Sequence, residues 1–390
     1  MGTSRKLLRP ADLPDNFTRS LYKVAPYRGC AHACRYCDGR AERYYFKGDY
    51  DRDIETRDDA PTLMAIELPG LREQGVVAFG SGTTDPYQPV EERLELTGRC
   101  ARILAEAKRS VPALVMTKSS LALRDLSSWI RVNERFGFTL LVSLTSLDET
   151  LRTTMEPGAS SFAARLDMLR AFKTAGCTVG VLAMPFLPGL SDLEDSIRTV
   201  YAACADIGVD FVMPGGLTLR PGRQKDCYLA TLEASHPDLI PMVHSLYLPE
   251  QPSGMPNKRG SSALFARIAA VRRDYSLPFL LPQKIFSRFL PRYDMLRVLY
   301  RDMAELYADR GVDIGPLVAS ARRYDAWLIE IRRYFRKHQL LPNDWLEERL
   351  NDAEQSGELG RILDNRKLNN FTLKVLREKA QLNYLSLSLE

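Results

Sequence analysis

The sequence of 390 residues lacks any apolar run long enough to cross a lipid bilayer, and it shows no signal-peptide pattern. Position 6 holds lysine, where N-myristoylation of Gly2 would require serine or threonine. Internal repeats and long low-complexity segments are lacking as well. These absences argue against a membrane, secreted or repeat protein. The ordinary globular composition predicts a cytoplasmic protein without a membrane partner.

Cysteine is scarce, and four of the seven cysteines stand alone, as expected for reduced thiols. These four are Cys100, Cys177, Cys204 and Cys227. The other three, Cys30, Cys34 and Cys37, lie within eight residues at the spacing C-x3-C-x2-C. A fourth cysteine is missing nearby, although a structural zinc site and a ferredoxin-type cluster each require four ligands. The triplet therefore favours a 4Fe–4S cluster with one open iron for a substrate or cosubstrate, and zinc is the alternative.

Positive charge is concentrated in the C-terminal third. The formal net charge is +5, but residues 258–390 contain 24 Lys and Arg against 17 Asp and Glu. The first 257 residues therefore carry a net charge of −2. A total this small does not by itself predict nucleic-acid binding, so the uneven distribution is soft support for such a partner.

Short apolar runs alternate with segments of helical periodicity over much of the chain. The apolar runs predict strands at residues 20–25, 76–79, 114–117, 139–143, 179–184 and 211–214. The periodic segments predict helices at residues 97–108, 123–135, 161–174 and 193–207. Six such units predict an α/β fold, a partial (β/α)6 TIM-like barrel with an α-helical C-terminal extension. We expect a lead-in at residues 1–19, the barrel at 20–253 and a helical domain at 254–390, which begins with a linker.

Polar residues follow the apolar runs, where the carboxyl ends of parallel strands would gather and bind ligands. They are Ser81, Gly82, Thr84 and Asp85 after the second run, Lys118 after the third and Ser143 at the end of the fourth. A glycine allows close approach of the backbone to a ligand, and hydroxyls and a carboxylate offer polar contacts. Lysine at a strand end is suited to meet a carboxylate as a point charge, or it simply faces solvent.

Several motifs occur in a fixed order between residues 20 and 250. They are R-G-C-x3-C-x-Y-C, T-D-P-Y-Q-P-x-E, T-K, S-L-T-S-L-D, E-P-G and P-F-L-P-G. This combination resembles the radical S-adenosylmethionine (SAM) enzymes, and within them the spore photoproduct lyase-like branch, often labelled DNA repair photolyases. In that family SAM chelates the open iron of a 4Fe–4S cluster and is cleaved reductively to a 5′-deoxyadenosyl radical. The resemblance implies a lyase-like radical enzyme that uses SAM, the cluster and a reductant such as flavodoxin or ferredoxin.

The resemblance also implies roles for individual residues. The cluster ligands would be Cys30, Cys34 and Cys37, and Tyr36 would lie beside the bound nucleoside. The SAM-binding residues would be Ser81, Gly82 and Asp85 in the turn that meets the methionine amino group, and Thr84, Lys118 and Ser143, which match positions that hold the methionyl group.

One position departs from the pattern of the branch. Spore photoproduct lyases carry a cysteine on the turn after the second strand, and it returns a hydrogen atom to the substrate radical. Gly82 stands at that position here. The same lesion reversal therefore needs a substitute donor, for which the candidates are Tyr87 and Cys227.

The predicted function is hydrogen abstraction from a nucleic-acid base, in repair or modification, from a substrate covered by the C-terminal helices. Basic and aromatic residues at positions 43–47 either stack on bases and neutralise phosphates or pack inward. Two alternatives stay open. One is radical modification of a protein, a peptide or a small metabolite. The other is a non-enzymatic, metal-bound nucleic-acid-binding module.

Overall fold

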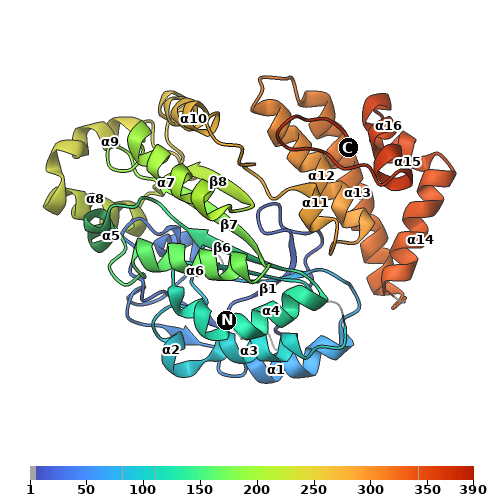
Figure 1. Cartoon of the computed structure of the whole chain (residues 1–390), viewed down its shortest axis with the longest axis horizontal. Coiled ribbons are helices and arrows are strands. Elements are labelled where there is room, and N and C mark those ends of the chain that lie inside the picture. The colour runs from blue at the N-terminus through green and yellow to red at the C-terminus, as the bar shows by residue number, and fades with distance from the viewer. Residues whose placement is uncertain (1–5, 81, 110, 341) are drawn as a thin grey trace.

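The computed structural model describes residues 6–80, 82–109, 111–340 and 342–390. Its centre is a sheet of six parallel strands that follow one another in chain order. The strands are β1 (Ser20–Val24), β4 (Val76–Phe79), β5 (Ala113–Thr117), β6 (Phe138–Ser143), β7 (Thr178–Phe186) and β8 (Phe211–Gly216). Among the strands of the described chain, β1 pairs only with β4 and β8 only with β7, so the barrel stays open between them (Figure 1). The predicted partial (β/α)6 barrel is confirmed.

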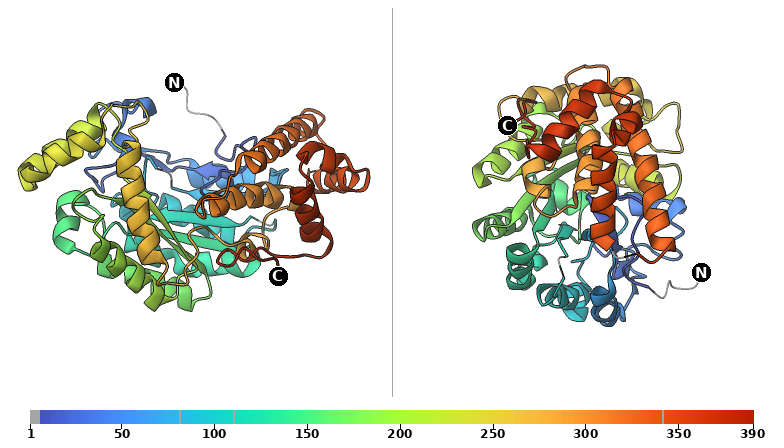
Figure 2. Two further views of the ribbon diagram at one scale, coloured as in Figure 1. Left: turned by 90° about the horizontal axis from the view of Figure 1, so that it is seen from above. Right: turned by 90° about the vertical axis from the view of Figure 1, so that its right-hand side faces the viewer.

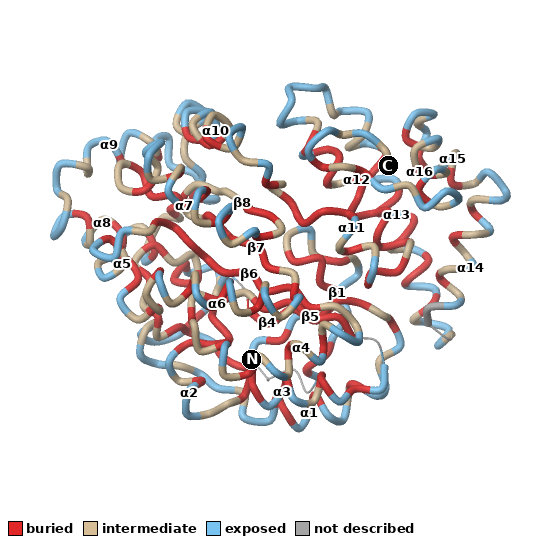
Figure 3. Tube along the Cα trace, viewed as in Figure 1, coloured by how far each residue is buried: buried red, intermediate tan, exposed pale blue. Residues whose placement is uncertain are grey.

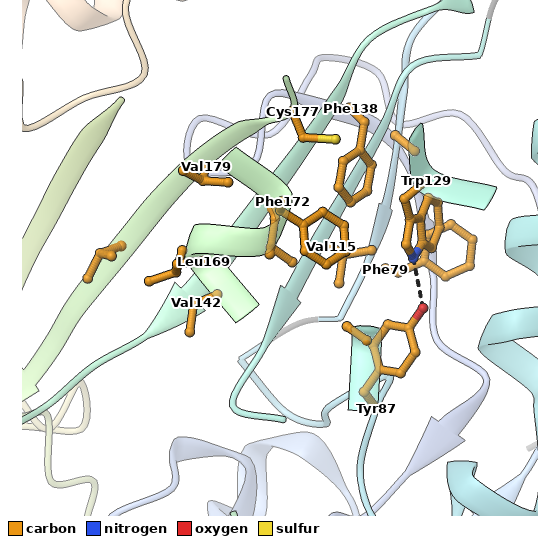
Figure 4. Packing of buried hydrophobic residues seen from close by; sticks show 14 of the residues in the cluster. Phe79, Tyr87, Val115, Trp129, Phe138, Val142, Leu169, Phe172, Cys177 and Val179 are labelled. Carbon is orange, nitrogen blue, oxygen red and sulfur yellow. Dashed lines mark hydrogen bonds between the residues drawn. The ribbon is translucent and has the colours of Figure 1, made fainter. Parts of the chain in front are cut away.

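Helices cover the outer face of this sheet. They are α1 (Ala60–Glu67), α3 (Leu96–Ala105), α4 (Leu126–Arg135), α6 (Phe162–Thr174), α7 (Glu194–Ile207) and α10 (Lys258–Arg272). Alternate strand residues face them, as strand geometry requires, so Val77 and Phe79 belong to this outer core. Trp129 of α4 stacks on Phe138 with ring centroids 4.8 Å apart (Figure 4).

The remaining C-terminal helices share a core with the opposite, concave face of the sheet. They are α11 (Gln283–Phe286), α12 (Arg292–Ala308), α13 (Gly315–Lys337), α14 (Pro342–Gln355), α15 (Glu358–Leu363) and α16 (Arg366–Arg377). One hydrophobic core joins Val76, Leu114 and Phe211, near the starts of their strands, with Leu296 and Leu328 of the helices. The helical extension is therefore confirmed, and it gathers at one side of the barrel (Figures 1 and 2).

The helix α10 follows the predicted domain boundary at residue 254, yet it packs on α7 of the barrel. That boundary stays a prediction. The strands and the inner sides of α12 and α13 are the most deeply buried parts of the chain (Figure 3). In the described part of the chain, no helix combines the length and apolar character needed to span a bilayer.

The connections at the carboxyl ends of the strands contain the shorter elements. A small antiparallel pair, β2 (Tyr27–Arg28) and β3 (Glu55–Thr56), closes the base of residues 29–54, which we call the cluster loop. This loop contains two 3-10 helices, η1 (Asp38–Arg40) and η2 (Glu42–Tyr44). The other helices of these connections are α2 (Glu91–Leu94), η4 (Ser120–Asp125), α5 (Glu149–Met155), α8 (Arg223–Ser235), η5 (Pro237–Leu239) and α9 (Ile240–Leu246).

Candidate active site

A cavity of 420 Å³ lies at the carboxyl ends of the strands. Three parts of the chain form its walls: the cluster loop, the ends of the strands with the turns that follow, and the N-terminal segment before β1. Of the predicted site residues, the walls include Cys30, Cys34, Cys37, Tyr36, Gly82, Thr84, Asp85, Lys118 and Ser143. Residues spread over more than a hundred positions of sequence thus meet in one cavity.

The three predicted ligands come from the first turns of the cluster loop. Cys30 and Cys34 are each 7% exposed, and Cys37 is partly exposed. The loop begins at Gly29, whose φ of +76° favours glycine, and a Cβ there would lie 3.0 Å from the carbonyl oxygen of Tyr50. Cys30 N–H donates to that same carbonyl at 2.9 Å. Gly29 therefore lets the chain turn tightly enough to aim the cysteines into the cavity.

These thiols fit an iron–sulfur cluster. Burial, the Asp85 carboxylate and the neighbouring thiols raise the pKa of Cys30, so a cationic group must displace its proton before the sulfur can ligate. Among the described residues, no three ligating side chains converge closely enough to surround a single metal ion. A cluster offers each cysteine a separate iron, so its ligands need not converge on one point. The donor set therefore suits a cluster better than a zinc ion.

The turn after β4 holds the start of the cluster loop. Thr84 Oγ1 donates to the Gly29 carbonyl at 2.7 Å, and Gln88 Nε2 donates to the same oxygen at 3.1 Å. Gln88 Oε1 accepts from Ala31 N–H at 2.8 Å. Thr84 lies on the cavity wall, but its hydroxyl donates its proton to the loop and not toward the cavity. The sequence prediction missed Gln88, although it stands in the T-D-P-Y-Q-P motif.

The carboxylate of Asp85 also interacts with other groups of the protein. Its Oδ1 accepts from Tyr87 N–H and Thr117 Oγ1, both at 2.8 Å. Its Oδ2 accepts from Lys118 N–H at 2.8 Å and lies 3.2 Å from His32 Nε2. Burial opposes ionisation, but His32 and the two backbone donors hold the pKa of this carboxyl below its usual range. With four partners, Asp85 ties β4, β5 and the cluster loop together.

Tyr36 is held by a buried ionic group behind the cavity. Its hydroxyl donates to Glu156, which also accepts from Arg165 Nη2 at 2.5 Å. Burial opposes ionisation, but Arg165 and Lys118 hold the pKa of Glu156 at about 2. Burial and Glu156 raise the pKa of Tyr36, so its phenol stays protonated and fixed as a donor. The ring is thereby locked in the cavity wall.

Lys118 and Ser143 face the cavity from neighbouring strand ends. The Lys118 ammonium lies 5.8 Å from the centroid of the Tyr36 ring and forms no ion pair with any described residue. This cation is therefore free to bind an anionic group. Ser143 is buried, and its backbone carbonyl accepts from Arg165 Nη1 at 2.9 Å, which fixes the strand end. A Cβ on Gly82 would find no atom within 4 Å.

Two predicted residues do not reach this cavity. Tyr87 is fully buried in the outer core and accepts from Trp129 Nε1 at 2.8 Å (Figure 4). Its hydroxyl donates to Asp125 at 3.1 Å. Cys227 lies on α8, and neither residue is among the described residues that line the cavity. The structure therefore argues against both as direct hydrogen donors. Ser81 lies outside the described residues.

The expected cover of C-terminal helices is wrong. Among the described lining residues, none lies beyond Gln224, because the helices fill the barrel from the amino ends of the strands. The N-terminal segment contributes Asp15, Phe17 and Thr18 instead, and β1 contributes Lys23. Sequence reasoning missed these residues, since no motif or periodicity marks them.

Comparisons with known proteins agree with this site. The family model described as the radical SAM superfamily matches residues 24–200. Uncharacterized protein Rv2578c of Mycobacterium tuberculosis (strain ATCC 25618 / H37Rv) is 32% identical over 232 residues, which cover 58% of this chain and 67% of that protein. Uncharacterized protein ORF301 of Acidianus two-tailed virus is 32% identical over 200 residues, covering 47% of this chain and 63% of that one.

A solved structure of a spore photoproduct lyase mutant, with bound AdoMet and dinucleoside spore photoproduct, is similar with a TM-score of 0.50. The sequence identity is 15%, and the match covers 69% of this chain and 78% of that one. At this identity the likeness concerns the fold. The family uses a 4Fe–4S cluster and SAM, which agrees with a thiol-lined cavity at the strand ends. By its sequence match, its fold and its cysteine loop, the chain belongs to the radical SAM superfamily.

Proposed function

We propose that this radical SAM enzyme abstracts a hydrogen atom from a nucleic-acid base, in repair or modification. The observation that carries the proposal is the shared cavity, in which three thiols, an ammonium group without an ion pair among the described residues and an aromatic ring share the space with a second wall that contains Asp15, Phe17 and Thr18. A cofactor would occupy the first side and a substrate the second. Membership of the superfamily speaks against the non-enzymatic module.

The cluster would be held by Cys30, Cys34 and Cys37. When bound, it supplies the electron for reductive cleavage of SAM. The chain positions the ligands from behind: Gln88 and Thr84 hold the start of the loop, and Asp85 contacts His32, which lies between Cys30 and Cys34. These contacts assign Thr84 and Asp85 a positioning role in place of direct binding to SAM.

SAM would be held by side chains that are free to face it. The Lys118 ammonium would meet the carboxylate, since no acidic side chain of the described chain lies within ion-pair distance of it, although its charge also acts on Glu156. The Ser143 hydroxyl would add a polar contact, and Gly82 would allow close approach of the methionyl group. Tyr36, fixed by Glu156, would lie beside the nucleoside.

A nucleic-acid substrate is supported by the surface of the cluster loop. Tyr45 is 74% exposed in a left-handed turn, and Arg43 and Lys47 beside it are exposed too. Phe46 is buried, so residues 43–47 combine the two predicted roles of contact with nucleic acid and inward packing. Exposed aromatic and basic side chains bind bases and phosphates of single strands. The spore photoproduct lyase structure holds a dinucleoside lesion in the same fold.

The alternative substrate is a protein, a peptide or a small metabolite. Because Gly82 carries no thiol and both predicted hydrogen donors lie outside the cavity, another group would have to return the hydrogen atom to the substrate radical.

We place the reaction in the cytoplasm, with flavodoxin or ferredoxin as the reductant. The fold alone does not choose between lyase and modification chemistry.

The test is release of 5′-deoxyadenosine by anaerobically reconstituted protein with SAM and a reductant. UV-damaged DNA, intact DNA and RNA are added in parallel, and Cys34→Ala serves as the control. We expect cysteine-dependent release that rises with one of the nucleic acids. Release that is indifferent to all three would move the substrate to the peptide or metabolite class. No release from protein that holds its cluster and binds SAM would refute radical chemistry.

A further inference from the structure

We propose that residues 15–18 form the wall of the cavity that receives the substrate base, with Phe17 as its stacking surface, and that the C-terminal helices hold this wall in place. The inference rests on the proposed function, because it names the part of the cavity that the substrate occupies. We call residues 15–19 the hook, since they fold back on themselves before β1.

The hook is a closed turn built around Asp15. Asp15 Oδ1 accepts from the backbone N–H groups of Phe17 and Thr18, each at 2.9 Å. Arg19 N–H donates to the Asp15 carbonyl at 2.9 Å, and Lys23 Nζ donates to Asp15 Oδ2 at 2.8 Å. Thr18 and Arg19 are buried, whereas Phe17 is partly exposed and lines the cavity. The turn therefore presents the Phe17 ring as part of a fixed surface.

The helices α12 and α13 fasten the segment that carries the hook. Arg297 Nη1 donates to the Pro14 carbonyl at 2.6 Å, and its Nη2 donates to Asn16 Oδ1 at 2.7 Å. Arg336 Nη2 of α13 donates to the carbonyl of Ala11, which precedes the hook in the chain, at 2.7 Å.

A buried ion pair fastens the other end of the hook. Arg19 pairs with Asp302 of α12, and the Tyr384 hydroxyl donates to the same carboxylate at 2.5 Å. Asp302 is fully buried, so loss of Arg19 would leave its charge without a cation. The C-terminal helices thus shape a wall that they do not themselves form.

The chemistry of the wall suits a planar base. Phe17 offers an aromatic face, and every base can stack on such a face. The Asp15–Lys23 pair offers a donor and an acceptor beside it, whereas the Thr18 hydroxyl is bound to Asp15 and Ser20 within the protein. Lys23 neutralises Asp15, which removes a charge that would repel a phosphate. Long peptides lack a rigid ring at most positions, so we favour a base over a peptide here.

The experiment measures binding of a fluorescent single-stranded oligothymidylate, with and without ultraviolet irradiation, and of an RNA of equal length. It uses anaerobically reconstituted protein with SAM and fluorescence anisotropy as the readout. Phe17→Leu keeps apolar volume against the C-terminal core and removes the aromatic face. We expect the dissociation constant for the preferred strand to rise at least about fivefold. Phe17→Tyr should restore it, and Phe265→Leu on α10, outside this cavity, should not change it.

A second variant tests the support of the wall. Arg297→Met should weaken the same binding although Arg297 does not line the cavity, whereas Arg377→Met, which removes an exposed partner of Glu354, should not. Unchanged affinity in folded Phe17→Leu and Arg297→Met proteins overturns the inference. Failure of the wild-type protein to bind any of the strands overturns it as well. Absence of 5′-deoxyadenosine with every nucleic acid, from wild-type protein that holds its cluster and binds SAM, refutes the proposed function separately.

Discussion

Replacing Gly158 by alanine should loosen the cluster loop from a distance. Gly158 belongs to the E-P-G turn after α5 and lies against the backbone of the loop. A Cβ at this position would lie 2.2 Å from the Ala31 carbonyl oxygen and 2.9 Å from His32 Cα. Both atoms belong to the backbone, so neither can rotate away. The turn and the loop would have to separate by about 1 Å to reach ordinary contact.

That separation breaks the hydrogen bonds between turn and loop. Gly158 N–H donates to the His32 carbonyl, and His32 Nδ1 lies against the Gly158 carbonyl, each at 2.9 Å. A shift of about 1 Å would take both pairs beyond hydrogen-bond distance. Losing two such bonds costs about 2 kcal/mol, and residual crowding brings the total to about 2–4 kcal/mol. For a chain of this length the melting temperature would fall by about 2–5 °C.

The assay compares thermal unfolding by circular dichroism with iron bound per chain after anaerobic reconstitution. Gly70→Ala is the matched control, because its φ is not in the left-handed region and a Cβ there meets no atom within 4 Å. We expect Gly158→Ala to bind less iron than the control and to lose it faster to a chelator. Equal melting temperatures and equal iron contents in the two variants would refute the reasoning.

Three further predictions concern single residues. Lys118→Met should weaken SAM binding by about tenfold or more in calorimetric titration, since it removes from the cavity a cation that has no ion pair among the described residues. Unchanged affinity would exclude Lys118 as the partner of the SAM carboxylate. Tyr87→Phe should lower the free energy of unfolding by about 1–3 kcal/mol, because Trp129 Nε1 loses its buried acceptor. The same variant should release 5′-deoxyadenosine at an unchanged rate. Loss of release in folded protein would restore Tyr87 as a candidate hydrogen donor. The pKa of Glu156 is lowered to about 2, because Arg165 and Lys118 outweigh the effect of burial. Ionised Glu156 therefore contributes up to about 3 kcal/mol to the free energy of unfolding. This contribution is present above about pH 4.5 and is lost as the pH falls toward 2. Urea unfolding between pH 6 and 3 should show this slope, and Glu156→Gln should flatten it.

The cluster loop and the sheet could be predicted from the sequence because their signals are local. The spacing of Cys30, Cys34 and Cys37 and the alternation of apolar runs each depend on neighbours within a few residues. Parallel strands then bring their carboxyl ends to one edge, which places Lys118 and Ser143 in the cavity without further information.

The direction of a side chain within a turn was harder to predict. Tyr87 and Gln88 are adjacent in one motif, yet Gln88 binds the cluster loop and Tyr87 points into the outer core. The sequence shows polar residues near a strand end but not whether they face a ligand or the protein. The contacts of Thr84 and Asp85 with the protein could not be predicted for this reason.

The hook could not be predicted at all, because its conformation depends on contacts between Pro14 and Arg297, which are 283 residues apart. No local pattern identifies such a pair. The arrangement has a functional consequence under our proposal. The residues that would hold SAM lie on the barrel, and the wall that would hold the substrate depends on α12 and α13. Changes in those helices could therefore alter the choice of substrate while Lys118 and the cysteines keep their positions.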